Sequence, residues 1–402
     1  MKKKLFFILL LFFLLIIYIY VMSIEVIPNS IVLMQGDNLN FATLWGINLH
    51  GFDEQKVMQA SSEIENSRSN GVGKIDLSLN LFENIPLKDV SVSVVPKTKV
   101  IPLGNAIGLK LYTDGVLVVG MSEIDGEKPY ANSDIREGDR IISINDKEIG
   151  TTDKLIETVN SSNGSELKVK YMRDNSELET SILPIRTSEN EYKLGLWVRD
   201  AAAGVGTASF YVPSSGKFAA LGHGISDADT GELITISNGE LVTTNIVLIQ
   251  KGEKGKPGEI KGSIEGGKKL GEISKNTKFG IVGNISNTGL MELTENEIDV
   301  ANRNEVKIGK AKIICELEIG KKEYYDVEIQ RVYTNNNKDN KSMLIKVTDE
   351  RLIDKTGGIV QGMSGSPIIQ DDKFVGAVTH VLVNDPLQGY GVFADMMLNQ
   401  MM

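Results

Sequence analysis

Cysteine and histidine are scarce in this chain of 402 residues, which contains one cysteine, Cys315, and three histidines. A single cysteine excludes an intramolecular disulfide. Cys315 lies in an apolar run, which indicates a buried strand residue rather than a reactive thiol. A structural zinc ion needs about four cysteine or histidine ligands, so we expect no metal site. We also expect no cofactor.

A net positive charge is also absent. The formal net charge is −10, which argues against a nucleic-acid partner and against adhesion to anionic membrane surfaces. Hydrophobic residues make up 41% and charged residues 24%, as in ordinary globular proteins, so the chain has enough apolar material for real cores. The length exceeds that of an average domain and predicts two or three domains.

The N-terminus combines a basic start with an apolar run. Lysines at positions 2–4 precede residues 5–22, which carry no charge. This run is near the lower limit for a spanning helix, and no small-residue cleavage site follows it. The lysines hold their end in the cytoplasm by the positive-inside rule. We therefore expect the chain after residue 23 to be exported and residues 1–23 to be an uncleaved membrane anchor, with a cleaved signal peptide as the alternative.

Residues 24–97 lack sustained helical periodicity and contain alternating apolar and polar runs, which predicts a small β-rich segment. Residues 98–186 differ, because strand patterns there surround a short helix that ends at Gly138 and an amphipathic helix that begins near Thr152. This succession resembles a PDZ domain, particularly in the Arg-Glu-Gly-Asp-Arg-Ile-Ile-Ser-Ile-Asn run at 136–145.

PDZ domains bind the C-termini of peptides through a loop of the form x-Φ-G-Φ, whose backbone N–H groups receive the terminal carboxylate. The peptide then adds as a strand to the edge of the sheet. The resemblance places this loop at Ala106-Ile107-Gly108-Leu109, so it implies that Ile107, Gly108 and Leu109 bind peptide C-termini. A PDZ domain with an occupied or vestigial groove is the alternative.

Residues 187–402 show many short apolar runs at near-regular spacing with turn residues between them, which predicts a β-barrel or sandwich. Near the end of this region, Gly362-Met-Ser-Gly-Ser-Pro forms a tight turn that can present the hydroxyl of Ser364 and leave backbone N–H groups pointing outward. The same composition is also typical of an ordinary β-turn between strands.

A serine nucleophile needs a base, and the base needs a third group to orient it. His223 lies between glycines, 141 residues before Ser364, whereas His380 lies in an apolar run and is also explained as a strand residue. The order histidine then serine is that of chymotrypsin-like barrels. The turn resembles the trypsin-like Gly-Asp-Ser-Gly-Gly-Pro, which makes Ser364 the nucleophile and the N–H groups of Gly362 and Ser364 the oxyanion hole. Ser366 then has only a turn role.

Three aspartates remain candidates for the orienting acid. Asp227 is four residues from His223 and is expected to be solvated. Asp349 closes a predicted strand, which would hold it rigidly, and Asp354 is expected to be a loop carboxylate.

Five parts of the chain resemble one family, the stage IV sporulation protein B peptidases of endospore-forming Firmicutes. They are the PDZ-like segment and the runs 195–207, 220–230, 356–370 and 376–386. The resemblance implies a mainly β protein with an N-terminal transmembrane helix, a PDZ domain and a chymotrypsin-like double β-barrel protease domain. The corresponding boundaries are 1–23, 24–97, 98–186 and 187–402.

The resemblance also implies a serine endopeptidase of sporulation signalling, with His223 as base, Asp349 as orienting acid and Ser364 as nucleophile. Such enzymes cleave themselves and then a membrane-bound regulator of an intramembrane metalloprotease, which releases processing of the sigma-K precursor. They act in the space between the two forespore membranes, and an inhibitory protein is a further expected partner. The rival interpretation is a noncatalytic, membrane-anchored PDZ scaffold that binds peptide C-termini.

Overall fold

The computed structural model describes most of the chain after residue 72 and shorter stretches before it. The described residues are 10–15, 18–19, 21–22, 30–36, 47–51, 58–59, 68–69, 72–81, 85–174, 176–290, 293, 296–334 and 340–402. The first three of these stretches are helical. Within the described ranges, no helix has both the length and the apolar character needed to cross a membrane. The predicted anchor over residues 1–23 lies partly outside them.

The segment predicted to be β-rich contains a sheet with the strand order β1-β6-β5-β2. In β6, Val90, Val92 and Val94 are fully buried, as expected for the inward face of an alternating strand. Val32 and Met34 join the core of the barrel at the C-terminal end of the chain, so this sheet packs against that barrel. The strands are β1 (Ser30–Met34), β2 (Ile47–Gly51), β5 (Gly73–Leu81) and β6 (Ile85–Val95), with a small hairpin of β3 (Met58–Gln59) and β4 (Arg68–Ser69).

The C-terminal region is a closed barrel with the strand order β23-β24-β25-β28-β27-β26. Its core includes the fully buried rings of Phe374 and Phe393. Helix α4 follows the last strand, and its Asp395 accepts a 2.8 Å hydrogen bond from the buried Arg303. The elements are β23 (Gly309–Glu318), β24 (Lys321–Val332), β25 (Met343–Val347), α3 (Glu350–Thr356), β26 (Pro367–Gln370), β27 (Lys373–Leu382), β28 (Asp385–Phe393) and α4 (Ala394–Asn399).

A second ring of strands precedes this barrel. The pairings run β8-β17-β20-β21-β16-β15 and return from β15 to β8. The expected mainly β fold with β-barrels is therefore confirmed. The ring consists of β8 (Ala106–Met121), β15 (Leu196–Val212), β16 (Lys217–Ala220), β17 (Ile236–Thr243), β20 (Lys269–Thr277) and β21 (Gly280–Ile285). Around it lie β7 (Lys99–Pro102), β18 (Asn245–Gln250), β19 (Glu259–Ser263) and β22 (Ile298–Asp299), with 3₁₀ turns at Thr288–Leu290 and Arg303–Glu305.

Strand β8 belongs to two cores, and a glycine changes which face is buried. Ile107, Leu109 and Leu111 pack into the first barrel, whereas Val116 and Val118 pack into the PDZ core. The buried positions therefore change from odd to even between the two halves, which a uniform strand cannot do. Gly115 lies between them at φ +91°, where a Cβ would approach the carbonyl oxygen of Ile141 to 2.6 Å. Glycine is required at this position.

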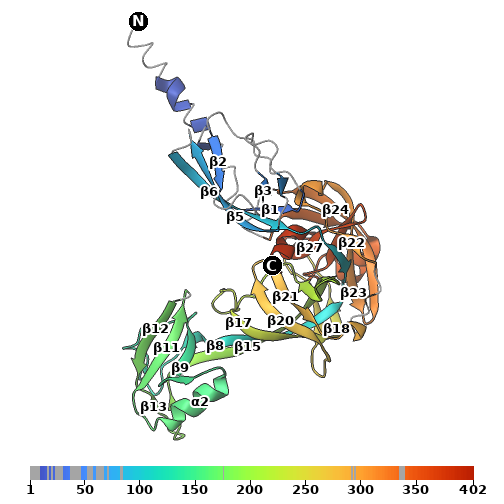
Figure 1. Cartoon of the computed structure of the whole chain (residues 1–402). Coiled ribbons are helices and arrows are strands. Elements are labelled where there is room, and N and C mark those ends of the chain that lie inside the picture. Colours follow the sequence, from blue (N-terminus) through green and yellow to red (C-terminus); the bar gives the residue numbers. More distant parts are fainter. Residues whose placement is uncertain are drawn as a thin grey trace.

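The PDZ fold lies between β8 and β15 and extends away from the barrels (Figure 1). The predicted amphipathic helix is present as α2, which begins at Thr152 and has Thr151 as its N-cap. Leu155 and Val159 are buried on its inner face. The elements are β9 (Arg140–Ile144), β10 (Lys147–Glu148), α2 (Thr152–Ser161), β11 (Leu167–Arg173), β12 (Ser176–Ile182), β13 (Ile185–Arg186) and β14 (Tyr192–Lys193).

The cores divide the chain differently from the predicted boundaries at 98, 186 and 187. Leu103 and its neighbours up to Leu111, expected in the PDZ domain, pack inside the first barrel. Leu194 and Leu196, expected in the peptidase domain, pack in the PDZ core. The reason is topological, because β8 and β15 pair along most of their length and run from one core into the other.

Candidate active site

The turn that carries Ser364 is held between the two barrels. Gly365 has φ +100°, and a Cβ there would lie 2.0 Å from the carbonyl oxygen of Thr207, so only glycine fits. The backbone N–H of Thr207 donates to the carbonyl oxygen of Ser364 at 3.0 Å, and its hydroxyl donates to that of Gly362 at 2.7 Å. The N–H of Gly365 donates to Val378 at 2.7 Å. β15 of the first barrel and β27 of the second therefore both fix the turn.

Two N–H groups of this turn remain unengaged. Among the residues that the structure describes, no protein acceptor receives a hydrogen bond from the N–H of Gly362 or of Ser364. The intervening Met363 donates to Val360 at 3.1 Å. The N–H groups of residues 362 and 364 are thus unengaged while that of residue 363 is bonded, which leaves two donors on the same turn as the serine. An oxyanion hole needs such a pair of donors.

His223 lies in the loop between β16 and β17. Its Nδ1 is 2.8 Å from the carbonyl oxygen of Gly224. Because a carbonyl can only accept a hydrogen bond, Nδ1 carries the proton and Nε2 keeps its lone pair, as a general base requires. Burial lowers the pKa of His223 below its ordinary value, so the ring is neutral at pH 7.

The backbone before His223 is strained. Leu221 has φ +70° and Gly222 has φ +68°. A left-handed conformation is uncommon for a bulky residue such as leucine, and such strain often occurs at functional sites. The N–H of Leu221 donates to the carbonyl oxygen of Thr207 at 3.2 Å, so the residue that holds the serine turn also holds the histidine loop.

Ser364, His223 and Gly362 line one cleft of about 480 Å³. His380 from β27 lines it too, with its ring centroid 5.1 Å from that of His223. Partial burial and the nearby His223 lower the pKa of His380 to about 4, with a smaller effect of Lys341. The sequence left the role of His380 open, and the structure places it in the cleft.

The hydroxyl of Ser364 donates to the carbonyl oxygen of Thr379 at 2.7 Å. It therefore does not donate to His223 in this state. A serine side chain changes its direction by rotation about one bond, so transfer of its proton to His223 requires a change of rotamer. The site has the groups for nucleophilic catalysis, with the hydroxyl in a resting position.

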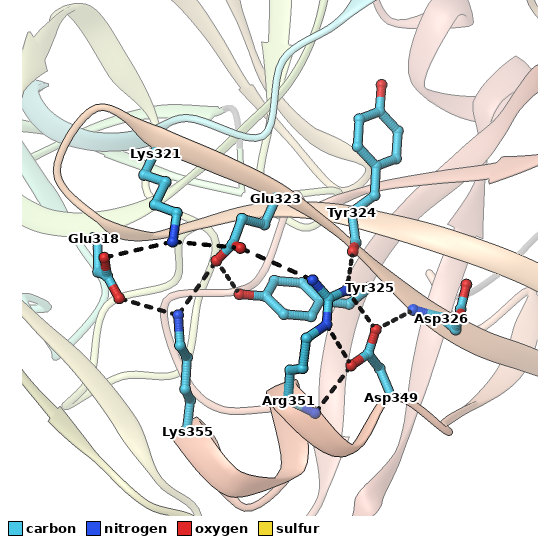
Figure 2. A network of polar contacts seen from close by, with 9 residues as sticks. All are labelled: Glu318, Lys321, Glu323, Tyr324, Tyr325, Asp326, Asp349, Arg351 and Lys355. Atoms are coloured by element: carbon cyan, nitrogen blue, oxygen red, sulfur yellow. Dashed lines mark hydrogen bonds and ion pairs between the residues drawn. The ribbon is translucent and has the colours of Figure 1, made fainter.

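The predicted pairing of Asp349 with His223 is not formed, and this assignment is corrected. The Asp349 carboxylate accepts from the guanidinium of Arg351 at 2.8 and 3.1 Å and from the N–H of Asp326 at 3.2 Å (Figure 2). It also caps helix α3 through the N–H of Arg351. The hydrogen bonds from Arg351 lower the pKa of Asp349 to about 2. Asp349 does not line the cleft.

The two other candidate aspartates do not orient His223 either. Asp227 is buried rather than solvated, because it pairs with Arg199 and accepts from the N–H groups of Asp229 and Thr230. Asp354 is exposed and lies on α3 rather than in a loop. In the described residues, the only hydrogen-bond partner of the His223 ring is the Gly224 carbonyl. Sequence reasoning missed this group because every residue carries a backbone carbonyl.

The predicted carboxylate loop of the PDZ domain also requires correction. Ile107 and Leu109 are 0% and 1% exposed inside the first barrel. Gly108 pairs with Val205 on one side and Val242 on the other, so this stretch has no free edge for a peptide.

A second cleft, of about 650 Å³, lies between α2 and the start of β15. Leu194, Leu196 and Val198 line it opposite Leu155 and Ile156. Over its first residues β15 pairs with β8 alone among the described strands, which leaves its other edge open. The sequence signal that was missed is a second x-Φ-G-Φ run, Lys193-Leu194-Gly195-Leu196.

A serine and a neutral histidine in one cleft between β-barrels, beside two free N–H donors, define the protein as a serine peptidase. The SpoIVB peptidase S55 family matches residues 190–398, more than half of the chain, and the PDZ domain family matches residues 92–183. The chain belongs to the SpoIVB peptidase S55 family.

Solved structures show further similarities. The PDZ domain of the SdrC-like protein from Listeria monocytogenes is 20% identical, with 21% of this chain and 87% of that chain covered and a TM-score of 0.19. The active form of Rv3671c protease from M. tuberculosis is 12% identical, with 61% and 84% covered and a TM-score of 0.28. The HtrA-type protease AlgW with decapeptide is 10% identical, with 74% and 63% covered and a TM-score of 0.31. No curated protein matches the chain significantly.

Proposed function

We propose that the protein is an endopeptidase in which Ser364 attacks the substrate carbonyl and His223 takes the serine proton. The N–H groups of Gly362 and Ser364 bind the developing oxyanion, and the Gly224 carbonyl holds His223 in the tautomer that can accept a proton. The observation that carries this proposal is the shared cleft of Ser364 and His223 beside two unengaged donors.

The biological role that we propose follows from family membership. The enzyme cleaves itself and then a membrane-bound regulator of an intramembrane metalloprotease, so that the sigma-K precursor is processed. The basic N-terminus and the apolar run of residues 5–22 support export with an N-terminal anchor. In this proposal, the enzyme acts between the two forespore membranes, where an inhibitory protein can restrain it.

The second cleft supports a role for the PDZ domain in binding peptide C-termini. Its lining of Leu194, Leu196 and Val198 provides an open strand edge and an apolar wall. A peptide added to this edge would place its terminal carboxylate near Gly195, which has φ +69°.

The test of catalysis compares two serines of the same turn. Ser364→Ala is expected to fold normally and to lose both self-cleavage and labelling by a fluorophosphonate probe. Ser366→Ala is the matched control. The Ser366 hydroxyl is fully buried and has no hydrogen-bond partner among the residues that the structure describes, so its removal should leave cleavage and labelling intact. Cleavage by purified Ser364→Ala protein would refute the proposal. The rival function, a noncatalytic PDZ scaffold, requires that Ser364 in the unaltered protein never reacts with the probe.

A further inference from the structure

The active-site cleft contains almost no charge. Its lining is formed by aliphatic side chains and glycines, together with the polar residues Gln361, Ser364 and Thr379 and the two histidines. In the part of the chain that the structure describes, no aspartate, glutamate, lysine or arginine lines the cleft. The two histidines have lowered pKa values and are neutral at pH 7.

The aliphatic residues form two walls that flank the nucleophile. One wall is the stretch of β15 at 202–205 from the first barrel, which ends two residues before the Thr207 that bonds to Ser364. The other wall comes from the second barrel, with Val360 just before the nucleophile turn and Val381 on β27. A substrate segment bound at Ser364 therefore lies between apolar surfaces on both sides.

This composition discriminates between substrate side chains. An apolar side chain that leaves water for the cleft gains about 25 cal/mol for each Å² buried. A lysine or glutamate side chain loses hydration and finds no opposite charge, which is unfavourable unless the charge is paired. A cleft of about 480 Å³ has room for a large aliphatic side chain.

We propose that the cleft selects substrates that carry an aliphatic side chain on the residue contributing the scissile carbonyl. This inference rests on the proposed peptidase function and adds the substrate class. Val205 and Val381, which line the two walls and are only partly buried, are the specificity-determining residues, and neither takes part in proton transfer.

The first experiment uses the full-length protein in detergent and internally quenched peptides that differ only at this residue. Peptides with leucine or valine are expected to be cleaved with a kcat/KM about a hundredfold higher than those with lysine or glutamate. Equal or faster cleavage of the lysine or glutamate peptides, with Ser364 still labelled by the fluorophosphonate, would overturn the specificity and leave the peptidase function standing. Absence of labelling would overturn both.

The second experiment places a carboxylate in the wall. Val205→Glu is expected to raise the lysine-to-leucine ratio of kcat/KM by about tenfold or more, because the new charge pairs with the substrate lysine. Val247→Glu is the control, since Val247 is 69% exposed on β18 and does not line the cleft, so its ratio should equal that of the unaltered protein.

Labelling of Ser364 by the probe verifies that each variant is folded. If Val205→Glu is not labelled, Ala203→Glu replaces it, because Ala203 lines the same wall and is exposed. An unchanged lysine-to-leucine ratio in a labelled wall variant would contradict the assignment of this wall.

Discussion

At the scale of single residues, the proposed mechanism depends on the protonation state of the His223 ring, because only the neutral ring can take the proton of Ser364. The ring is neutral only above its pKa, and burial lowers that pKa below the ordinary value of about 6.5. In a plot of kcat/KM against pH, the fall on the acidic side (the acidic limb) is therefore expected below pH 6.5, because activity is lost as His223 becomes protonated. Rates measured from pH 4 to pH 8 test this.

A second titrating ring in the cleft makes a control necessary. His380→Gln should retain the acidic limb, because the limb belongs to His223. A limb at or above pH 6.5 in the unaltered protein, or its disappearance in His380→Gln, would show that another group governs the rate.

The sequence predicted the residue types of this site better than their contacts. Ser364 and His223 were predicted from the glycine-bearing serine turn, the chymotrypsin-like order of histidine and serine, and the family resemblance, and the structure places both residues in one cleft. The orienting group could not be identified, since Gly224 acts through its backbone oxygen. A rigid position at the end of a predicted strand favours Asp349, but the sequence does not show that Arg351, two residues later, donates hydrogen bonds to its carboxylate.

At the scale of elements, Asp349 stabilises the start of α3 rather than the active site. Asp349→Ala removes the N-cap and the pair with Arg351, and is expected to lower the free energy of unfolding by about 1–2 kcal/mol. Because the pKa of Asp349 in the folded protein is about 2, this contribution is present above about pH 4 and is lost as the pH falls through about 2. At 25 °C and pH 7, kcat/KM should stay within about tenfold of the unaltered protein.

Thermal unfolding and peptide cleavage together test this assignment, and Asp354→Ala on the exposed face of the same helix is the control. An orienting acid would give the opposite result. In that case Asp349→Ala would lose about 10⁴-fold in kcat with its melting temperature unchanged.

Strand pairing explains why the sequence pointed to the wrong loop as the one that receives a peptide's terminal carboxylate. The form x-Φ-G-Φ occurs at Ala106–Leu109 and again at Lys193–Leu196, and both runs suit a PDZ loop. What separates them is pairing, because Gly108 has a strand on each side whereas the start of β15 keeps a free edge. The partner of Gly108 on β17 is Val242, and no local pattern reveals a pairing over that distance.

At the scale of the whole molecule, the PDZ domain is an insertion into the first barrel. β8 enters it and β15 leaves it, and Tyr112 pairs with Ala201 at the junction. Replacing residues 113–200 with a short turn between these two residues is therefore expected to leave a folded barrel whose Ser364 is still labelled by the probe. The same variant should lose binding of peptide C-termini.

The matched comparison is a chain restricted to residues 187–402. It lacks β8, with Ile107, Leu109 and Leu111 of the barrel core, and also Leu103, which precedes that strand. Loss of each such side chain costs about 2–5 kcal/mol, so this chain is expected not to fold. Circular dichroism and probe labelling measure both variants. A folded, labelled 187–402 chain would show that the barrel does not depend on β8.

The bond from the N–H of Ala106 to the carboxylate of Glu316 joins residues 210 positions apart, and the core of the second barrel includes Met396 and Met397. The ribosome makes the chain from the N-terminus, so β8 cannot pair with β17 until β17 has been synthesised. The turn that carries Ser364 cannot reach its folded position until residues far along the chain have been made. The order of synthesis thus delays catalysis. The proposed self-cleavage can therefore begin only after α4 has been made.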